Sequence, residues 1–441
     1  MTAPETADLS KYHRLLELAI PIRTYGKVSE IIGLVVEGQV PAVSIGEVCG
    51  ILPNGRDKFL NAEVVGFKQG KVMLMPLESL QGLGPGCKIM SLGKKASVRV
   101  GKGLLGRVID GLGNPIDSQG FGNFEDEYPL YAEPINPLQR GRISEPMDFG
   151  VRALNSLFTC GKGQRLGIFA GSGVGKSVLM GMIARNTKAD VNVIGLIGER
   201  GREVREFLEK NLGPEGLARS VVVVAASDMH PLIRMRAAYV ATSVAEFFRD
   251  QGADVLLMVD SLTRFAMAQR EIGLSVGEPP TTKGYTPSVF SLMPKLLERS
   301  GTIEGRGSIT GLYTILVEGD DFNEPVADAA RSILDGHITL SRDLAHKNHY
   351  PAIDALQSIS RVMVDLVDRE HKQKAGEVLN ILATYKKAED LINIGAYQKG
   401  SNPEIDRAIN MIGRVNAFLR QGIEEQVSFD QSRRDLFALC G

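Results

Sequence analysis

The chain has 441 residues, more than one ordinary hydrophobic core accommodates, so we expect two or three domains. Hydrophobic residues make up 43% and charged residues 23% of the sequence, a balance that excludes a disordered or fibrous protein. The 51 basic and 52 acidic residues leave a net charge of -1, so no overall positive field exists to hold nucleic acid or an anionic membrane.

The amino-terminal region, residues 1–25, predicts one short helix and an extension. Apolar residues between Leu9 and Ile20 fall at steps of three and four before Pro21. This helix either packs on its own domain or binds a partner or a membrane surface. Residues 1–23 contain acidic side chains and no continuous apolar stretch, so they predict neither a signal peptide nor a membrane span.

Cysteine spacing agrees with a cytoplasmic protein. The sequence contains no C-x-x-C pair, which argues against a zinc site or a disulfide framework. We therefore expect reduced thiols at the four cysteines, Cys49, Cys87, Cys160 and Cys440.

Residues 26–98 predict a small β domain. Short β-branched runs broken by Gly and Pro are typical of a β-barrel or sandwich. These runs cover residues 27–36, 42–45, 62–67, 71–75 and 96–100. No catalytic motif is legible in this region.

Residues 99–361 predict an α/β domain, and residues 362–441 predict a helical carboxy-terminal domain. In the first of these, strand-like apolar runs alternate with helical patterns, which is typical of a parallel sheet covered by helices on both faces. After residue 361 the apolar residues fall at helical spacing. The expected core strands are residues 165–169, 192–197, 221–225, 255–259 and 313–317.

The strongest motif is a phosphate-binding loop, or P-loop, between a strand-like run and a helical stretch. Its glycines let backbone N–H groups face phosphate oxygens, and the helix that follows offers its positive end. Lys176 is expected to reach the terminal phosphates and Ser177 to bind magnesium. The motif begins with Ala where the usual pattern has Gly, and its residues are Ala170, Gly171, Ser172, Gly173, Val174, Gly175, Lys176 and Ser177.

Two carboxylates follow other strand-like runs. Asp260 ends the run 253–259, where an Asp is by itself more often a helix cap. The P-loop earlier in the chain favours a position at the sheet edge beside magnesium instead. Glu199 ends the run 193–198, where a carboxylate can orient and deprotonate the attacking water. We expect the charged stretch 200–206 to be mainly a solvated helix face, with Arg200 a lesser candidate for contact with a phosphate or a carboxylate.

Several segments resemble the hexameric ATPases related to the catalytic and regulatory subunits of rotary ATP synthases. They are residues 198–204, 260–290, 317–325 and 349–361, and the last contains the superfamily pattern P-A-I-D-x-x-x-S-x-S. Residues 303–310, 333–342, 394–400 and 405–409 most resemble the type III protein export ATPases, and among them the flagellar members. The resemblance covers nearly the whole chain and implies a RecA-like core between a β-barrel and a helical domain.

The resemblance also implies roles for single residues. Lys176 and Ser177 would hold phosphate and magnesium, Glu199 would activate water and Asp260 would belong to the magnesium shell. Tyr350 would stack on adenine. Arg361 matches the arginine finger that reaches the nucleotide of the neighbouring subunit, although the residues alone indicate only a surface arginine at a domain border.

The function that the resemblance implies is ATP hydrolysis in a homohexameric ring, with ATP and Mg²⁺ as ligands. The ring would lie at the cytoplasmic base of a flagellar export apparatus, peripheral to the inner membrane. Hydrolysis would release export substrates from chaperones. The expected partners are further copies of the chain, regulator, stalk and gate proteins, and chaperone–substrate complexes, without nucleic acid.

Other functions remain open at this point. A virulence-type secretion ATPase shares the same chemistry. A rotary ATP synthase subunit pairs with a non-identical subunit, whereas Glu199 and Arg361 in one chain favour a homo-oligomer. An RNA-translocating hexamer shares an aspartate segment like residues 260–264, but residues 26–98 have no dense basic patch beside Phe59 and Phe67. A non-catalytic nucleotide-binding regulator is disfavoured, because Lys176, Glu199 and Asp260 are all present.

Overall fold

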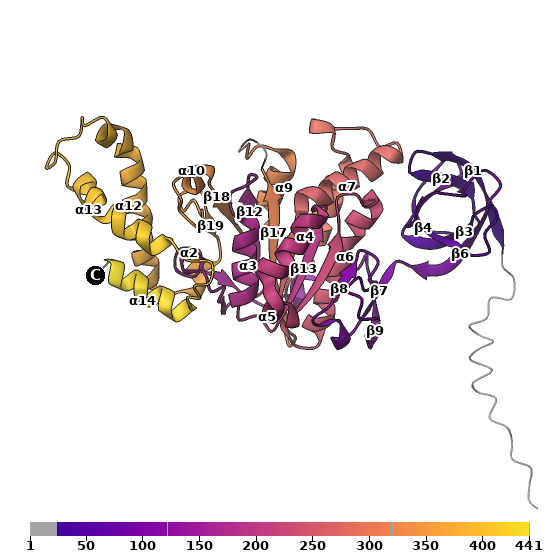
Figure 1. Ribbon diagram of the computed structural model, residues 1–441, viewed down its shortest axis with the longest axis horizontal. Helices are drawn as coiled ribbons and strands as arrows, with labels where there is room; N and C mark the ends of the chain where they lie inside the picture. The colour runs from indigo at the N-terminus through magenta and orange to yellow at the C-terminus, as the bar shows by residue number, and fades with distance from the viewer. Residues whose placement is uncertain (1–23, 121, 318, 320, 441) are drawn as a thin grey trace, which may run out of the picture. The chain divides into compact units, whose positions relative to one another are not determined.

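A computed structural model describes residues 24–120, 122–317, 319 and 321–440 (Figure 1). The predicted helix between Leu9 and Ile20 lies outside the described residues. The chain divides between Ala96 and Ser97 into two compact units, which are described separately below. In the described ranges, no helix combines the length and apolar character that a membrane crossing requires.

The first unit is a closed antiparallel β-barrel, as predicted. Its strands run in the order β1-β2-β5-β4-β3-β6, and β6 pairs with β1 to close the barrel. Closure removes exposed strand edges, and side chains such as Val36, Ile51 and Leu74 fill the interior. The strands are β1 (Tyr25–Ile32), β2 (Val35–Gln39), β3 (Glu47–Leu52), β4 (Leu60–Lys68), β5 (Lys71–Pro76) and β6 (Lys88–Lys95).

Three of the predicted strand runs in this region were wrong in detail. The run 27–36 is two strands, because Gly33 adopts a left-handed φ of 57° that turns the chain back on itself. Residues 42–45 form a turn and not a strand, and the run 96–100 is β7 (Ser97–Val100), which pairs with β9 (Asp126–Pro129) of the second unit. The pattern missed β3, which Gly50 interrupts, and β6, which ends in exposed lysines.

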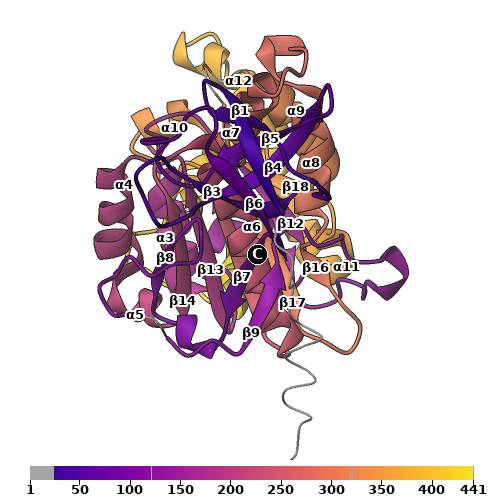
Figure 2. The same cartoon turned by 90° about the vertical axis from the view of Figure 1, so that its right-hand side faces the viewer.

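The second unit is built on a nine-stranded, mostly parallel sheet. Its main order is β19-β18-β12-β17-β15-β13-β14-β8, with β16 pairing on β17. In Figure 2, β8, β14 and β13 follow one another across this sheet. The strands are β8 (Val108–Asp110), β12 (Arg165–Ala170), β13 (Val191–Ile197), β14 (Ser220–Ala225), β15 (Asp254–Asp260), β16 (Gly301–Thr302), β17 (Ser308–Leu316), β18 (Gly336–Leu340) and β19 (Ile359–Ser360).

All five predicted core strands are confirmed, as β12, β13, β14, β15 and β17. These strands are almost entirely buried, which is why continuous apolar runs identified them. The short strands β8 and β18 carry too few apolar residues to stand out. Because the five strands run parallel, their carboxyl ends meet at one edge of the sheet and bring the loops after β12, β13 and β15 together.

Helices of several lengths surround the sheet. The long helix α6 begins at Pro231 and packs against β13, β14 and β15, whereas α3 packs on the segment that follows β13. That segment is continuous: α4 is followed by a π-helical stretch, η3, and then by α5. The helices are α2 (Arg152–Leu157), α3 (Lys176–Asn186), α4 (Gly201–Glu206), η3 (Phe207–Leu212), α5 (Gly213–Ala218), α6 (Pro231–Asp250), α7 (Leu262–Ser275), α8 (Pro287–Leu297), α9 (Pro325–Ile333), α10 (Arg342–His346) and α11 (Met363–Leu366).

The carboxy-terminal part of the second unit is helical, as predicted. It consists of α12 (Arg369–Asn393), α13 (Pro403–Leu419) and α14 (Phe429–Cys440). Asp368 and Asn402 cap α12 and α13 by accepting backbone N–H bonds, so both helices begin where the sequence offers a cap. Hydrogen bonds also join these helices to α2, including one of 2.7 Å between His371 Nε2 and the carbonyl of Ser156.

Candidate functional site

The P-loop connects β12 to α3 at the carboxyl edge of the sheet. Gly173 and Gly175 have φ angles of 79° and 87°, which lie in the left-handed region that favours glycine. No side chain caps the start of α3, and its first turn has no acidic residue. The first backbone N–H groups of this helix therefore remain available to an anion, which the positive end of the helix also attracts.

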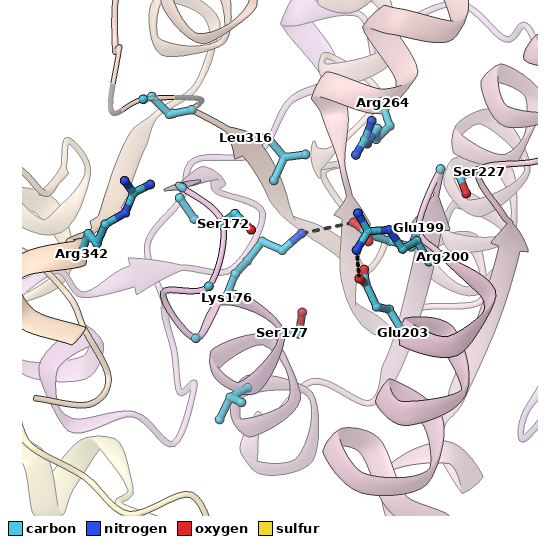
Figure 3. A pocket seen from close by; sticks show the side chains of 18 residues that line it. Ser172, Lys176, Ser177, Glu199, Arg200, Glu203, Ser227, Arg264, Leu316 and Arg342 are labelled. Carbon is cyan, nitrogen blue, oxygen red and sulfur yellow. Dashed lines mark hydrogen bonds and ion pairs between the residues drawn. The ribbon is translucent and has the colours of Figure 1, made fainter. Parts of the chain in front are cut away.

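A cavity of about 660 Å³ opens over this loop. Figure 3 shows Lys176 reaching across the cavity toward Glu199, with Arg264 on the far side and Arg342 on the opposite side of the loop. The volume suits a nucleotide-sized ligand. The side chains drawn with labels are those of Ser172, Lys176, Ser177, Glu199, Arg200, Glu203, Ser227, Arg264, Leu316 and Arg342.

Lys176 joins the two carboxylates that the sequence singled out. Its Nζ lies 2.5 Å from Asp260 Oδ1 and 3.3 Å from Glu199 Oε1. Burial alone would lower the pKa of Lys176, but the charges of Asp260 and Glu199 outweigh burial and raise it. Thr314 Oγ1 donates a second hydrogen bond of 2.6 Å to Asp260 Oδ1, so this buried carboxylate is fixed in place.

Glu199 has an unusual affinity for protons. Burial, followed by the charge of Asp260 and a hydrogen bond with Glu203, raises its pKa to about 7, although Lys176 opposes the shift. The pKa of Glu203 is lowered, chiefly by the same hydrogen bond with Glu199 and then by Arg200. Glu199 therefore holds the proton of this carboxyl pair, with a pKa close to neutral pH, where a general base works best.

The raised pKa makes a prediction about stability. The folded protein binds a proton at Glu199 more tightly than the unfolded chain, so this group's contribution to stability is lost as pH rises through about 7. We expect Glu199→Gln, which is always neutral, to raise the melting temperature of the nucleotide-free protein more at pH 8 than at pH 5.5. Differential scanning calorimetry measures this. Glu209→Gln, on the exposed side of the same helical segment, serves as the control and should show no such difference.

The structure brings most of the predicted site residues together, but not all of them. Arg200 lines the cavity and pairs with Glu203 at 3.2 Å, whereas Val174 is buried in the hydrophobic core. The ring of Tyr350 lies beside the loop, because a Cβ at Gly175 would sit 3.4 Å from it. Arg361 is exposed, lies outside the lining of this cavity and donates a bond of 3.1 Å to the carbonyl of Arg331.

Sequence reasoning missed Glu203, Arg264 and Thr314. Glu203 belongs to the charged stretch that was expected to face solvent. Its position around the helix nevertheless places it in the lining of the cavity. Arg264 packs its stem on Gly198, where a Cβ would come within 3.0 Å of the arginine Cβ. The sequence does give an indication for Thr314, because a hydroxyl inside a buried strand such as β17 must find a hydrogen-bond partner.

The oxygen donors at this edge fit a magnesium ion. Ser177 offers a hydroxyl in the first turn of α3, and Asp260 offers a carboxylate at the end of β15. Within the described ranges, no group of three or more His, Cys, Asp or Glu side chains is placed to hold a metal. A P-loop site does not require such a group, since Mg²⁺ is held there by one or two protein oxygens together with phosphates.

Comparison with known proteins identifies the family in all three regions. The ATP synthase alpha/beta family, nucleotide-binding domain, matches residues 150–360, and the beta-barrel domain of the same family matches residues 28–93. The T3SS EscN ATPase C-terminal domain matches residues 367–438.

Individual relatives match over nearly their whole length. The flagellum-specific ATP synthase of Bacillus subtilis (strain 168) is 52% identical, with 97% of both chains covered. The type 3 secretion system ATPase of Xanthomonas euvesicatoria is 50% identical, with 93% of this chain and 92% of the relative covered. The solved structure of the assembled ATPase EscN from the type III secretion system of enteropathogenic E. coli has a TM-score of 0.89 at 46% identity, with 94% of this chain and 100% of that chain covered. The chain therefore belongs to the ATP synthase alpha/beta family, in the group of flagellar and type III export ATPases, and is an ATP-hydrolysing enzyme.

Proposed function

We propose that this export ATPase works in a flagellar apparatus, as a homohexameric ring at the cytoplasmic face of the inner membrane. There, hydrolysis would release export substrates from their chaperones. The observation that carries the enzymatic part is the meeting of Lys176 with Glu199 and Asp260 over the P-loop. The flagellar assignment is supported by relatives named flagellum-specific ATP synthase in Bacillus subtilis, Treponema pallidum and Salmonella typhimurium.

Residues of the P-loop and around it would have separate roles in hydrolysis. Lys176 and the loop N–H groups would bind the β- and γ-phosphates. Tyr350, whose ring lies beside the loop, would stack on the adenine ring. Ser177 and Asp260 would hold Mg²⁺, which neutralises charge on the phosphate oxygens. Arg200 and Arg264 lie where they can contact the same oxygens.

Glu199 acts on the nucleophile. It accepts a proton from water as the water oxygen bonds to the γ-phosphorus and the bond from that phosphorus to the bridging oxygen of ADP breaks. Its pKa of about 7 keeps a useful fraction of the carboxylate ionised while preserving its basicity. Glu203, which is hydrogen-bonded to Glu199, orients the base. The reaction releases ADP and phosphate, and the proton leaves Glu199 to solvent.

A neighbouring copy completes the site in this proposal. Arg361 is exposed and lies outside the cavity of its own chain, so it is available to the nucleotide of an adjacent subunit. The solved EscN structures support assembly, since one is titled as assembled and another as in complex with its central stalk EscO. We extend self-assembly and a stalk partner to this chain, together with regulator and gate proteins and chaperone–substrate complexes.

Two measurements test the proposed function. The purified chain should hydrolyse ATP with a specific activity that rises with protein concentration, because a shared site forms only on assembly. Deleting the gene should remove flagellar filaments and swimming, and re-expression should restore both. Motile cells would refute the flagellar assignment and leave the enzyme intact. In that case the virulence-type role becomes the better one, which the relative from Xanthomonas euvesicatoria supports.

A further inference from the structure

Arg185 occupies the end of the P-loop helix that is remote from the nucleotide. Helix α3 starts at Lys176, and Arg185 follows nine residues later in its last turn. At a rise of about 1.5 Å per residue, the two backbones lie about 14 Å apart along the helix. Arg185 also lies outside the lining of the cavity, so it cannot touch the reacting atoms.

The guanidinium of Arg185 bonds two other parts of the chain at once. Its Nη1 donates to the carbonyl of Asn211 and lies 3.5 Å from that of Lys210, at the end of η3. Its Nη2 donates a bond of 2.8 Å to the carbonyl of Ile423, and the carboxylate of Glu424 lies 3.9 Å away. The side chain is only 18% exposed. A planar guanidinium places two nitrogens in a fixed fork, so each can serve a separate acceptor, whereas an ammonium presents all its donors from one atom.

The first of these parts lies close in sequence to the proposed base. Glu199 lies two residues before α4 and Glu203 lies within α4, and Arg185 holds the end of η3, which continues α4. This end also packs tightly on α3, because a Cβ at Gly181 would lie 2.7 Å from Asn211. The segment contains the π-helical stretch Phe207–Leu212, a rare conformation that often occurs at functional sites. Asn211 is thus held by α3 at two points, through Gly181 and through Arg185.

The second part is the connector 420–428 between α13 and α14, which belongs to the carboxy-terminal helices. Arg152 of α2 holds this same region through the carbonyls of Phe418 and Arg420, at 3.1 and 3.0 Å, and through Glu425. Within the described residues, Arg152 makes no hydrogen bond or ion pair to the segment 200–212. Both arginines thus bond the region around the connector, but only Arg185 also bonds the segment 200–212.

We propose that Arg185 is a positioning residue that couples the carboxy-terminal helices to the catalytic segment bearing Glu199 and Glu203. A displacement of the connector at Ile423 is passed through one guanidinium to Asn211 and from there along the segment. The inference rests on the proposed role of Glu199 as the base. Helix α3 then has two roles. Its first turn binds phosphate, and Arg185 in its last turn links it to the carboxy-terminal helices.

The test compares Arg185→Ala with Arg152→Ala in the full chain, under assembling conditions and well below the melting temperature of either variant. For Arg185→Ala we expect a fall in single-turnover hydrolysis of about 10- to 100-fold, because a small misplacement of catalytic groups has effects of that size. The KM for ATP should change less than threefold. Arg152→Ala, which loosens the connector while Arg185 stays in place, should slow single turnover less than Arg185→Ala does. In the double variant it should add nothing to the effect of Arg185→Ala, because the path through Arg185 is then already broken.

Hydrogen exchange supplies a readout that does not depend on activity. Exchange at residues 207–212 should rise strongly in Arg185→Ala and less in Arg152→Ala, and the double variant should match Arg185→Ala. If Arg185→Ala does not fold, Arg185→Lys replaces it and should show a loss in the same direction, since lysine lacks the two-nitrogen fork that bonds Asn211 and Ile423 from different nitrogens.

Additive effects of the two substitutions in the double variant, or normal turnover in Arg185→Ala, would overturn the coupling. Normal turnover in Glu199→Gln would instead refute the proposed base, so the two failures are distinguishable.

Discussion

Replacing Glu199 by Gln is expected to abolish ATP turnover while ATP binding persists. The substitution keeps the size and the hydrogen-bonding ability of the side chain but removes the site that accepts a proton from water. A positioned general base contributes about 10²- to 10⁴-fold to a rate, so turnover should fall from the wild-type value by at least that factor. Steady-state phosphate release measures turnover, and titration with a fluorescent ATP analogue measures binding.

The raised pKa of Glu199 adds an expected dependence of the rate on pH. Because burial raises the pKa to about 7, the wild-type rate should rise with pH across neutrality as the carboxylate becomes available. Besides burial, the groups that set this value are Lys176, Asp260 and Glu203, whereas Arg200 acts on the pKa of Glu203. Glu199→Gln should show no such rise. Normal hydrolysis by Glu199→Gln would remove Glu199 from the role of base.

Lys176→Ala is the matched comparison for binding. Its ammonium contacts both Glu199 and Asp260, and it is the cation of the P-loop. Without it, ATP affinity and turnover should fall together, and two buried carboxylates lose their counter-charge. The pair of variants thus separates the two proposed roles, phosphate binding by Lys176 and activation of water by Glu199.

From the sequence alone, those parts of the site could be predicted that lie within one short segment or at the end of a strand. The P-loop was legible because strand, glycine loop and helix follow one another within a single segment, as β12 and α3 confirm. Asp260 and Glu199 were legible because each ends a continuous apolar run, and parallel strands bring such ends to one edge. These inferences required only the order of elements and the direction of the strands.

Contacts between distant segments were not predictable in the same way. Nothing near Thr314 in the sequence indicates that its hydroxyl meets Asp260, 54 residues earlier. Arg185 bonds Ile423, which lies 238 residues later, through a backbone carbonyl that any residue type would provide. Barrel strand β6 escaped detection because its burial depends on partners β1 and β3 and not on its own apolar content. Packing decides these features, and a single sequence does not record it.

Arg361→Ala is expected to leave a folded chain that is nearly inactive. The side chain is exposed, and its Nη2 contact is with a single backbone carbonyl, so its removal should have little effect on stability. As an arginine finger it would stabilise charge on the phosphate in the transition state of a neighbour, which is worth about 10³- to 10⁵-fold in rate. Activity should fall by that factor, and the melting temperature and ATP affinity should change little.

Mixing variants tests whether the finger acts between subunits. Arg361→Ala keeps an intact P-loop, and Lys176→Ala keeps an intact finger, so a site at their shared interface holds both groups. In a ring of head-to-tail interfaces assembled at random from equal amounts, about a quarter of the sites combine them in the productive order. Activity should therefore recover to about a quarter of wild type at most, although each variant alone is inactive.

The control replaces one partner by a chain that carries both substitutions. Mixed with Arg361→Ala, this chain supplies no finger, so no interface is complete and activity should stay at the level of the single variants. Recovery in that control would show that reassembly alone raises activity. Absence of recovery in the original mixture, with assembly confirmed by light scattering, would place Arg361 outside the neighbour's site. The exposed position of Arg361, away from the cavity of its own chain, leads us to expect recovery only where a second copy provides the phosphate site.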